Sequence, residues 1–286
     1  MPSWIDPPIT AVREAVTRGL AEDLTPIGDL TSALLDPRTW CVAHMAARQS
    51  GRIAGVMCAV ETFAQVDPLI TATWNLVDGD ACQVGSVIGV VEGPLVSVLT
   101  AERTALNFMG HLSGIATLTA SYVDAAARGG GAKVWDTRKT TPGLRSLEKA
   151  AVRAGGGRNH RGNLSDWVLL KDNHITGVGI ADAVARSRDL WPGRSVHIEC
   201  ERLEQMVEAI ESGATAVLLD NMTPAEVSDC VTAARGTESG RRCLLEVSGG
   251  VTLDTIAAYS ATGVDQISIG RITNSAPVLD IGLDCQ

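Results

Sequence analysis

The chain has 286 residues, of which 45% are hydrophobic, 3% aromatic and 20% charged, a balance typical of a folded globular protein. Lys and Arg number 24 against 33 Asp and Glu, and the net charge of −9 argues against a protein that binds nucleic acid or an anionic membrane over its whole surface. The sequence has neither a run of about 18 apolar residues nor a basic-then-apolar signal peptide, so we expect a cytoplasmic protein that does not enter a membrane.

The seven cysteines are scattered and form no Cys-x-x-Cys pair. This spacing predicts neither a disulfide framework nor a thiolate zinc site. We interpret most of them as small apolar residues of the core.

The first hundred residues have the pattern of an α+β module. An amphipathic helix is predicted over residues 9–20. Strand-like runs follow, with turn residues between them, at 39–47, 52–60, 71–76 and 86–92. We expect an antiparallel sheet with a helix over one face.

The rest of the chain alternates helices with short apolar runs. A helix is predicted over 100–128, with Gly110 and Gly114 as its weak points, and a capping Thr223 opens a later helix. Strands are predicted at 133–136, 167–171, 196–201, 216–220, 244–248 and 266–270. Without a Gly-x-Gly-x-x-Gly fingerprint, this series favours an α/β barrel, with a doubly wound sheet as the alternative.

Each predicted strand ends in polar residues. In a barrel these ends gather at one mouth, where side chains from different strands converge on one ligand. The alternative interpretation, that loops after strands are polar because water covers them, explains poorly why Lys171, Glu199 and Asp220 directly end apolar runs.

Positive charge is concentrated between residues 131 and 171, where nine cations stand against three anions. Arg138, Lys139, Arg161 and Lys171 flank strand ends, so we expect them to bind an anionic ligand. The pair Lys149 and Arg153 could equally be the solvated face of a helix.

Further residues complete the candidate site. Glu199 and Asp220 end successive strands and would suit Mg²⁺ held against a polyphosphate, although salt bridges to nearby cations are the alternative. Small-residue turns at 248–252 and 268–270 would offer backbone N–H groups to a phosphate. His160 is interpreted either as a ligand contact or as a structural histidine.

Taken together, these motifs resemble one family, quinolinate phosphoribosyltransferase, also called carboxylating nicotinate-nucleotide pyrophosphorylase. The longest is Asp-Thr-Arg-Lys-Thr-Thr-Pro-Gly-Leu-Arg at 136–145. The others lie at 22–24, 28–31, 102–107, 113–117, 155–157, 160–161, 164–166, 170–174, 199–201, 219–222 and 248–250, so the resemblance spans nearly the whole chain.

The resemblance implies a reaction of type II phosphoribosyltransferases. The 5-phosphoribosyl group of phosphoribosyl pyrophosphate would pass to quinolinate with loss of CO₂, which gives nicotinate mononucleotide and pyrophosphate for de novo NAD synthesis, with Mg²⁺ as cofactor. It also implies an incomplete α/β barrel of fewer than eight strands, preceded by an open-faced α+β sandwich. We expect the sandwich at 1–114 and the barrel at 115–286, with the C-terminal tail packed back on the sandwich.

The family's residue roles are carried over by position. Arg138, His160, Arg161, Lys139 and Lys171 would line the dicarboxylate pocket and the adjoining pyrophosphate position, Glu199 and Asp220 would serve the metal and the ribose hydroxyls, and Ser248, Gly249, Gly250 and Gly270 would hold the 5-phosphate. Lys139, Lys171, Glu199 and Asp220 form the expected catalytic group. Arg103 would reach in from the neighbouring subunit of a homodimer.

The sequence departs from the family's pattern at Val247, Arg271 and Asn274, all near the phosphate end of the expected site. Two other functions remain open: a related phosphoribosyltransferase for a monocarboxylate such as nicotinate, and a non-catalytic protein that binds a phosphate ligand. A monocarboxylate pocket would not need Arg103, Arg138 and Arg161 together. A phosphate receptor would gain little from the carboxylates of Glu199 and Asp220.

Overall fold

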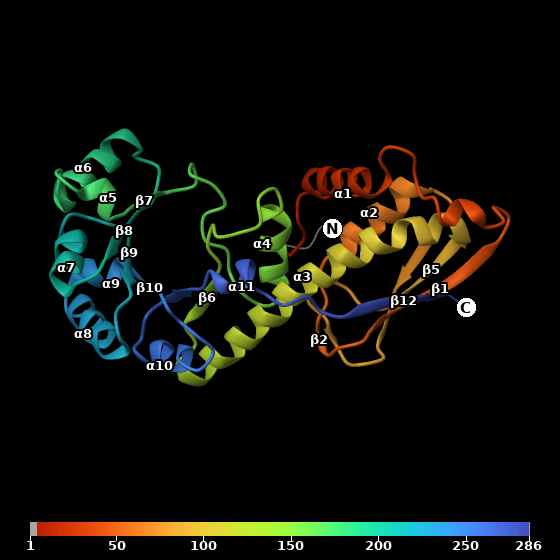
Figure 1. Ribbon diagram of the computed structural model, residues 1–286. Helices are drawn as coiled ribbons and strands as arrows, with labels where there is room; N and C mark the ends of the chain where they lie inside the picture. Colours follow the sequence, from red (N-terminus) through yellow and green to blue (C-terminus); the bar gives the residue numbers. More distant parts are fainter. Residues whose placement is uncertain (1–4, 286) are drawn as a thin grey trace. The chain divides into compact units, whose positions relative to one another are not determined.

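The computed structural model describes residues 5–285, which form two compact units (Figure 1). The first unit contains residues 5–120, 139–156 and 271–285, and the second contains residues 121–138 and 157–270. Among the described residues, no helix is both long enough and apolar enough to cross a membrane.

The first unit is built on an antiparallel sheet with the strand order β12-β1-β5-β3. These strands are β1 (Trp40–Ala47), β3 (Thr71–Trp74), β5 (Val87–Pro94) and β12 (Ile281–Cys285), and β2 (Gly51–Arg52) pairs separately with β4 (Ala81–Cys82). The helices are α1 (Ile9–Leu24), α2 (Val56–Val66), α4 (Arg145–Ala154), α11 (Arg271–Asn274), a 3₁₀ turn (Ser32–Leu34) and the first part of α3 (Leu95–Gly129).

One core joins the sheet of the first unit to α2 and α3. Met45 of β1, Ile88 of β5, Phe63 of α2 and Met109 of α3 are all buried in the same cluster. Every second residue of β1 is buried, as expected for a strand with one face on the core. The predicted helix over one face of an antiparallel sheet is confirmed (Figure 1).

Two predictions for this unit were wrong or incomplete. The run at 52–60, predicted as a strand, contains the start of α2, which begins after Gly55 at a φ of 93°. Its buried residues Cys58, Ala59, Thr62 and Phe63 follow a helical repeat, which a short apolar run does not reveal by itself. Strand β12 was not predicted, although it pairs with β1 from Ala43 to Ala47.

The second unit contains six parallel strands in the order β6-β11-β10-β9-β8-β7. They are β6 (Lys133–Trp135), β7 (Val168–Leu170), β8 (Val196–Cys200), β9 (Ala216–Asp220), β10 (Leu244–Ser248) and β11 (Gln266–Ser268), which confirms all six predicted strands. The helices are α5 (Asp172–Ile175), α6 (Ile180–Leu190), α7 (Leu203–Glu211), α8 (Pro224–Arg235), α9 (Glu238–Arg242) and α10 (Ile256–Ala261). Thr223 caps α8 as predicted.

The strand order decides between the two predicted architectures. From β7 to β11 each strand lies beside the next in the chain, and the first strand, β6, pairs with the last, β11. A doubly wound sheet instead reverses its order at a central switch point. The unit is therefore an incomplete α/β barrel of fewer than eight strands, as expected.

The predicted boundary between residues 114 and 115 falls inside α3 and stays a prediction. The cysteine interpretation holds, because all seven cysteines are free and only Cys285 is exposed.

The glycines of α3 are points of close backbone approach rather than weak points. Leu279 donates its N–H to the carbonyl oxygen of Gly110 at 2.9 Å. A Cβ added to Gly114 would lie 2.0 Å from the carbonyl oxygen of Pro277. The segment that leads into β12 can cross α3 here only because these positions carry no side chain.

We predict that Gly114→Ala lowers the free energy of unfolding by about 1–3 kcal/mol, because the added methyl group overlaps the Pro277 carbonyl. Urea denaturation followed by circular dichroism measures the change. Gly193→Ala is the matched control, because an added Cβ there has no atom within 4 Å, and its effect should stay within about 0.5 kcal/mol. Equal midpoints for the two variants would show that the 277–279 segment moves at no cost.

Candidate functional site

Polar residues occupy the carboxyl-terminal edge of the parallel sheet. Lys171 directly follows β7, Glu199 lies near the end of β8, Asp220 ends β9, Ser248 ends β10 and Gly270 follows β11. Asp220 and Ser248 are register partners, so they lie at the same level of the sheet. Parallel pairing therefore places all five at one edge, as the barrel prediction required.

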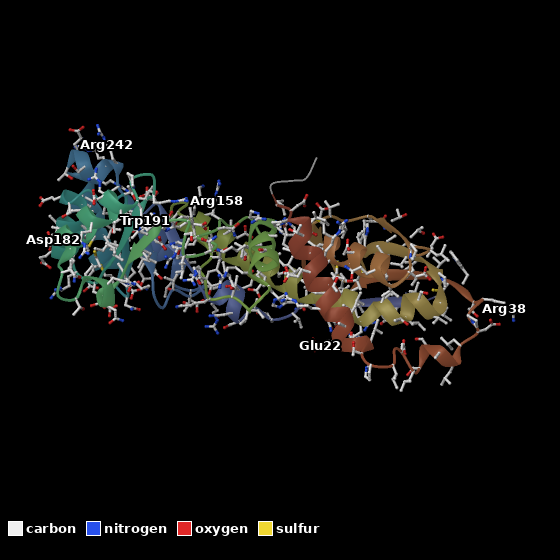
Figure 2. All side chains as sticks on the ribbon, turned by 90° about the horizontal axis from the view of Figure 1, so that it is seen from above. Glu22, Arg38, Arg158, Asp182, Trp191 and Arg242 are labelled. Atoms are coloured by element: carbon white, nitrogen blue, oxygen red, sulfur yellow. The ribbon has the colours of Figure 1, made fainter. Side chains whose placement is uncertain are left out.

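A loop segment extends the sheet beyond β6 and fixes two further predicted residues. Arg158 forms a parallel bridge with Trp135, donating its N–H to Val134 and accepting from Asp136. The Arg158 side chain is exposed (Figure 2), whereas His160 is only 7% exposed. Because Arg158 pairs with β6, the residues that follow it, His160 and Arg161, also lie near the edge of β6.

Asp136 holds this segment in place, a role that the sequence alone did not reveal. Its carboxylate is fully buried and accepts hydrogen bonds from the backbone N–H of His160 at 2.8 Å and from the side-chain amide of Asn159 at 2.6 Å. A buried carboxylate directly after a short apolar strand was the available signal, because such a charge needs donors nearby.

Two guanidinium groups lie close enough to influence each other. Burial, and next the positive charge of Arg138, lower the pKa of Arg161, while Asp166 acts in the opposite direction. Both groups remain charged, since arginine does not lose its proton in proteins. Two adjacent planar cations at a sheet edge are suited to a ligand with two carboxylates, which arginine binds bidentately.

The carboxylates of the candidate site each have a partner. Glu199 Oε2 forms a close ion pair with Lys171 Nζ, and Asp220 Oδ2 accepts a hydrogen bond from Asn221 Nδ2 at 2.7 Å. The salt-bridge alternative is therefore realised for Glu199. Oxygen donors on two adjacent strands also fit Mg²⁺, which keeps several waters and takes its other ligands from substrate phosphates.

The turn after β10 depends on glycine. Gly249 has a φ of 90°, and a Cβ added there would lie 2.3 Å from Asn221 Oδ1. Asn221 itself has a φ of 56° and donates its N–H to Ser248 O at 3.0 Å. Gly250, at a φ of 64°, continues the turn, and such consecutive turns expose N–H groups suited to a phosphate.

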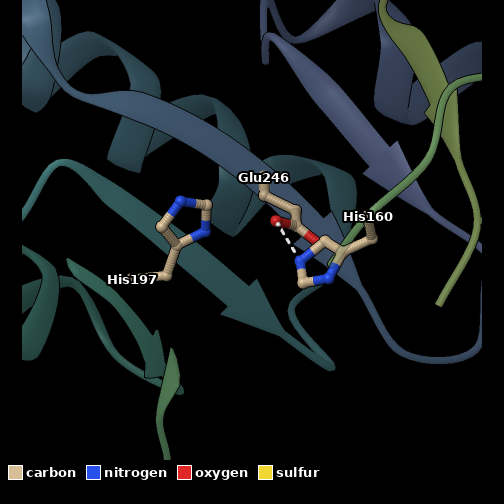
Figure 3. A group of neighbouring side chains, drawn as sticks. All are labelled: His160, His197 and Glu246. Carbon is tan, nitrogen blue, oxygen red and sulfur yellow. Dashed lines mark ion pairs between the residues drawn. The ribbon is translucent and has the colours of Figure 1, made fainter. Parts of the chain in front are cut away.

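Below this edge, the predicted site residue His160 meets polar and aromatic side chains that sequence reasoning missed, namely His197, Glu246 and Trp167. His160, His197 and Glu246 are buried and point toward one another (Figure 3). Trp167 stacks on His197 with ring centroids 5.1 Å apart and meets His160 edge-on at 5.0 Å. The available signal was a charged or imidazole residue inside each apolar strand, two positions before Glu199 in β8 and before Ser248 in β10.

Burial shapes the charge of this cluster. Loss of water, which outweighs the attraction of Glu246, lowers the pKa of His197 to about 4. Burial works to raise the pKa of Glu246, but hydrogen bonding and attraction from His160, with a hydrogen bond from Gln266, hold it below its usual value. Gln266 Nε2 donates to Glu246 Oε2 at 2.8 Å.

Arg103 and Lys139 belong to the first unit. The Arg103 side chain is 68% exposed and only 4.0 Å from Glu102, and Lys139 is exposed while its carbonyl accepts from Thr273 Oγ1 at 2.8 Å. Arg271 and Asn274, the departures from the family pattern in α11, are also exposed, whereas Val247 is buried in β10.

The solvated-face interpretation of Lys149 and Arg153 was wrong. Lys149 is only 6% exposed, and Arg153 Nη2 donates to the carbonyls of Ile5 and Asp6. Glu148 beside them is fully buried, with Oε1 2.9 Å from His111 Nε2 and Oε2 accepting from Thr141 N. These charges of α4 serve the packing of the first unit.

Family models match both parts of the chain. The model described as "Quinolinate phosphoribosyl transferase, C-terminal domain" matches residues 115–284, and the corresponding N-terminal domain model matches residues 29–113. The chain is 40% identical over 278 residues to "Nicotinate-nucleotide pyrophosphorylase [carboxylating]" of Mycobacterium leprae, covering 96% of this chain and 97% of that protein. It is 41% identical over 260 residues to the probable enzyme of that name in Bacillus subtilis, covering 90% and 88%.

A solved structure is similar over its full length. The nicotinate-nucleotide pyrophosphorylase from Francisella tularensis superposes with a TM-score of 0.94 at 37% sequence identity, covering 100% of both chains.

We predict that Asp136→Asn lowers the free energy of unfolding by about 1.5–3 kcal/mol, because the amide cannot accept from both His160 N and Asn159 Nδ2. Hydrogen exchange should show faster exchange of the His160 amide. Asp182→Asn, an exposed position on α6 (Figure 2), is the control and should change neither measurement. Unchanged protection at His160 would contradict the role given to Asp136.

Proposed function

Because the chain belongs to the quinolinate phosphoribosyltransferase family, we propose that it transfers the 5-phosphoribosyl group of phosphoribosyl pyrophosphate to the ring nitrogen of quinolinate. The products are nicotinate mononucleotide, pyrophosphate and CO₂. The observation that carries the proposal is that Lys171, Glu199, Asp220 and Ser248 meet at one sheet edge, with His160 and Arg161 following a segment that pairs with β6.

The acceptor is held by cations. The guanidinium groups of Arg138 and Arg161 bind the two carboxylates of quinolinate, and His160 contacts the same ligand. Burial and, next, repulsion from Arg138 lower the pKa of Arg161, and a bound anion relieves this repulsion. This supports a dicarboxylate over a monocarboxylate such as nicotinate, which would neutralise only one of the two charges.

The departing pyrophosphate needs positive charge. Lys171 supplies an ammonium group for it and exchanges part of its interaction with Glu199 for the substrate. Glu199 and Asp220 would hold Mg²⁺ together with the phosphates and water. When bound, the ion neutralises charge that develops on the leaving group.

The sugar develops positive charge as pyrophosphate leaves. Glu199 and Asp220, fixed at the ends of β8 and β9, stabilise that charge electrostatically, and no covalent nucleophile is required. The turn at Ser248, Gly249 and Gly250, with Gly270, binds the 5-phosphate through backbone N–H groups.

Loss of CO₂ follows from the charge of the product ring. The electron pair of the breaking carbon–carboxylate bond stays on the ring carbon, where the adjacent positive ring nitrogen stabilises it until a proton takes the place of the carboxylate. The pocket cations continue to bind the remaining carboxylate during this step.

We also propose that the protein is a cytoplasmic homodimer. The exposed Arg103 guanidinium is available to a second protomer, where it adds a further cation for the substrate.

Incubation of the purified protein with quinolinate, phosphoribosyl pyrophosphate and Mg²⁺ should yield nicotinate mononucleotide and CO₂ in equal amounts. Nicotinate in place of quinolinate should give at most trace product, and chelation of Mg²⁺ should slow turnover. If product forms with nicotinate but not with quinolinate, the protein is the related phosphoribosyltransferase for a monocarboxylate. If the substrates bind but no product forms, it is the non-catalytic protein that binds a phosphate ligand.

Arg161→Ala should raise KM for quinolinate about 10- to 100-fold, the effect of losing one charge-assisted contact, and leave KM for phosphoribosyl pyrophosphate within about threefold. Steady-state kinetics with each substrate varied in turn measures both. Arg158→Ala removes an exposed guanidinium from the same segment and should alter neither constant. Equal increases in both KM values for Arg161→Ala would place Arg161 outside the acceptor pocket.

A further inference from the structure

Three potential metal ligands meet inside the partial barrel. His160 follows the segment that extends β6, His197 lies on β8 and Glu246 lies on β10. One ligand atom of each lies within 4.8 Å of the others. Their exposed fractions are 7%, 6% and 0%, so this is not an exposed acidic cluster of the kind common on protein surfaces.

A ring nitrogen of His197, Nδ1, is buried without a hydrogen-bond partner among the described residues. Buried polar atoms are nearly always satisfied, so an orphaned ring nitrogen requires an explanation. Stacking on Trp167 fixes the ring, and Figure 3 shows the His197 side chain directed toward Glu246 and His160.

We propose that His160, His197 and Glu246 form a binding site for a transition-metal ion of the zinc class, separate from the carboxylates of Glu199 and Asp220. Two imidazoles with one carboxylate form a common zinc donor set. At bond lengths of about 2.0–2.1 Å, ligand atoms of a tetrahedral ion lie about 3.3–3.4 Å apart. His160 Nε2 and Glu246 Oε2 are 3.4 Å apart, and a ligand atom of His197 lies within 4.8 Å of those of the other two residues.

The surroundings orient the ligands and set the selectivity. Gln266 holds the Glu246 carboxylate from the neighbouring strand, as partners of metal ligands commonly do. The Arg161 charge acts on His197 and opposes any cation. A magnesium ion gains too little from imidazole to overcome this repulsion, whereas zinc, copper and nickel bind imidazole strongly.

Occupation of this site would remove His160 from the acceptor pocket that we propose above. The fourth metal position remains open to water or to a ligand atom. We therefore expect zinc to inhibit turnover, although the binding itself does not depend on the proposed reaction.

The test is metal binding by the full-length protein. Zinc titration against a chromogenic chelator should give one site that Mg²⁺ does not displace. His197→Phe keeps an aromatic ring against Trp167, and Glu246→Gln keeps the shape of the side chain. Each variant should weaken zinc binding at least about 100-fold, because loss of a residue that only hydrogen-bonds a metal ligand already weakens binding by up to about 100-fold. His44→Gln on β1 is the control and should bind as the wild type does.

Cobalt(II) reports the donor atoms of the wild-type protein directly. A tetrahedral nitrogen and oxygen site gives visible d–d bands without thiolate charge-transfer absorption, which separates this site from the cysteines. Absence of such bands, thiolate absorption, or unchanged affinity in folded His197→Phe and Glu246→Gln proteins would overturn the proposal. The cobalt spectrum decides the question even if a variant does not fold.

Discussion

The parallel pairing of six strands is the constraint on which the candidate site depends. Parallel strands direct all their carboxyl ends to one edge, so residues that are distant in the chain become neighbours there. Asp220 and Ser248 illustrate this, because they are register partners across β9 and β10. The Lys171–Glu199 pair joins β7 to β8 in the same way. A cation and an anion that end separate strands thereby become one electrostatic unit.

Two-residue periodicity extends this constraint into the barrel interior. Glu199 and Ser248 lie at the edge, and the residues two positions earlier, His197 and Glu246, face the same side one layer deeper. Burying the Glu246 carboxylate costs free energy because it loses water. A hydrogen bond from Gln266 and the close contact with the His160 ring offset that cost. This layer of the interior therefore carries two imidazoles and a carboxylate, where barrel interiors are mostly filled by branched apolar side chains.

Backbone pairing outside the regular strands positions the remaining cations. The 158–160 segment adds to the open side of β6, and buried Asp136 accepts hydrogen bonds from it. The segment that carries His160 and Arg161 is thus held at the end of β6, the strand that Arg138 follows in the chain. A site held in this way keeps its charges close together in spite of their repulsion.

The sequence by itself determined the six barrel strands, the helix that Thr223 caps and the strand-end positions of Lys171, Glu199 and Asp220, because these depend on local hydrophobic periodicity and on chain order. It did not determine α2, where a short apolar run suits a strand and a helix equally well, nor β12, which exists through its pairing with β1. Only the tertiary structure decided that Asp136 anchors the His160 segment, that Lys149 is buried, and that His160, His197 and Glu246 meet. The physical reason is that a side chain's role in these cases depends on partners from other strands and loops, and sequence spacing carries no record of those distances.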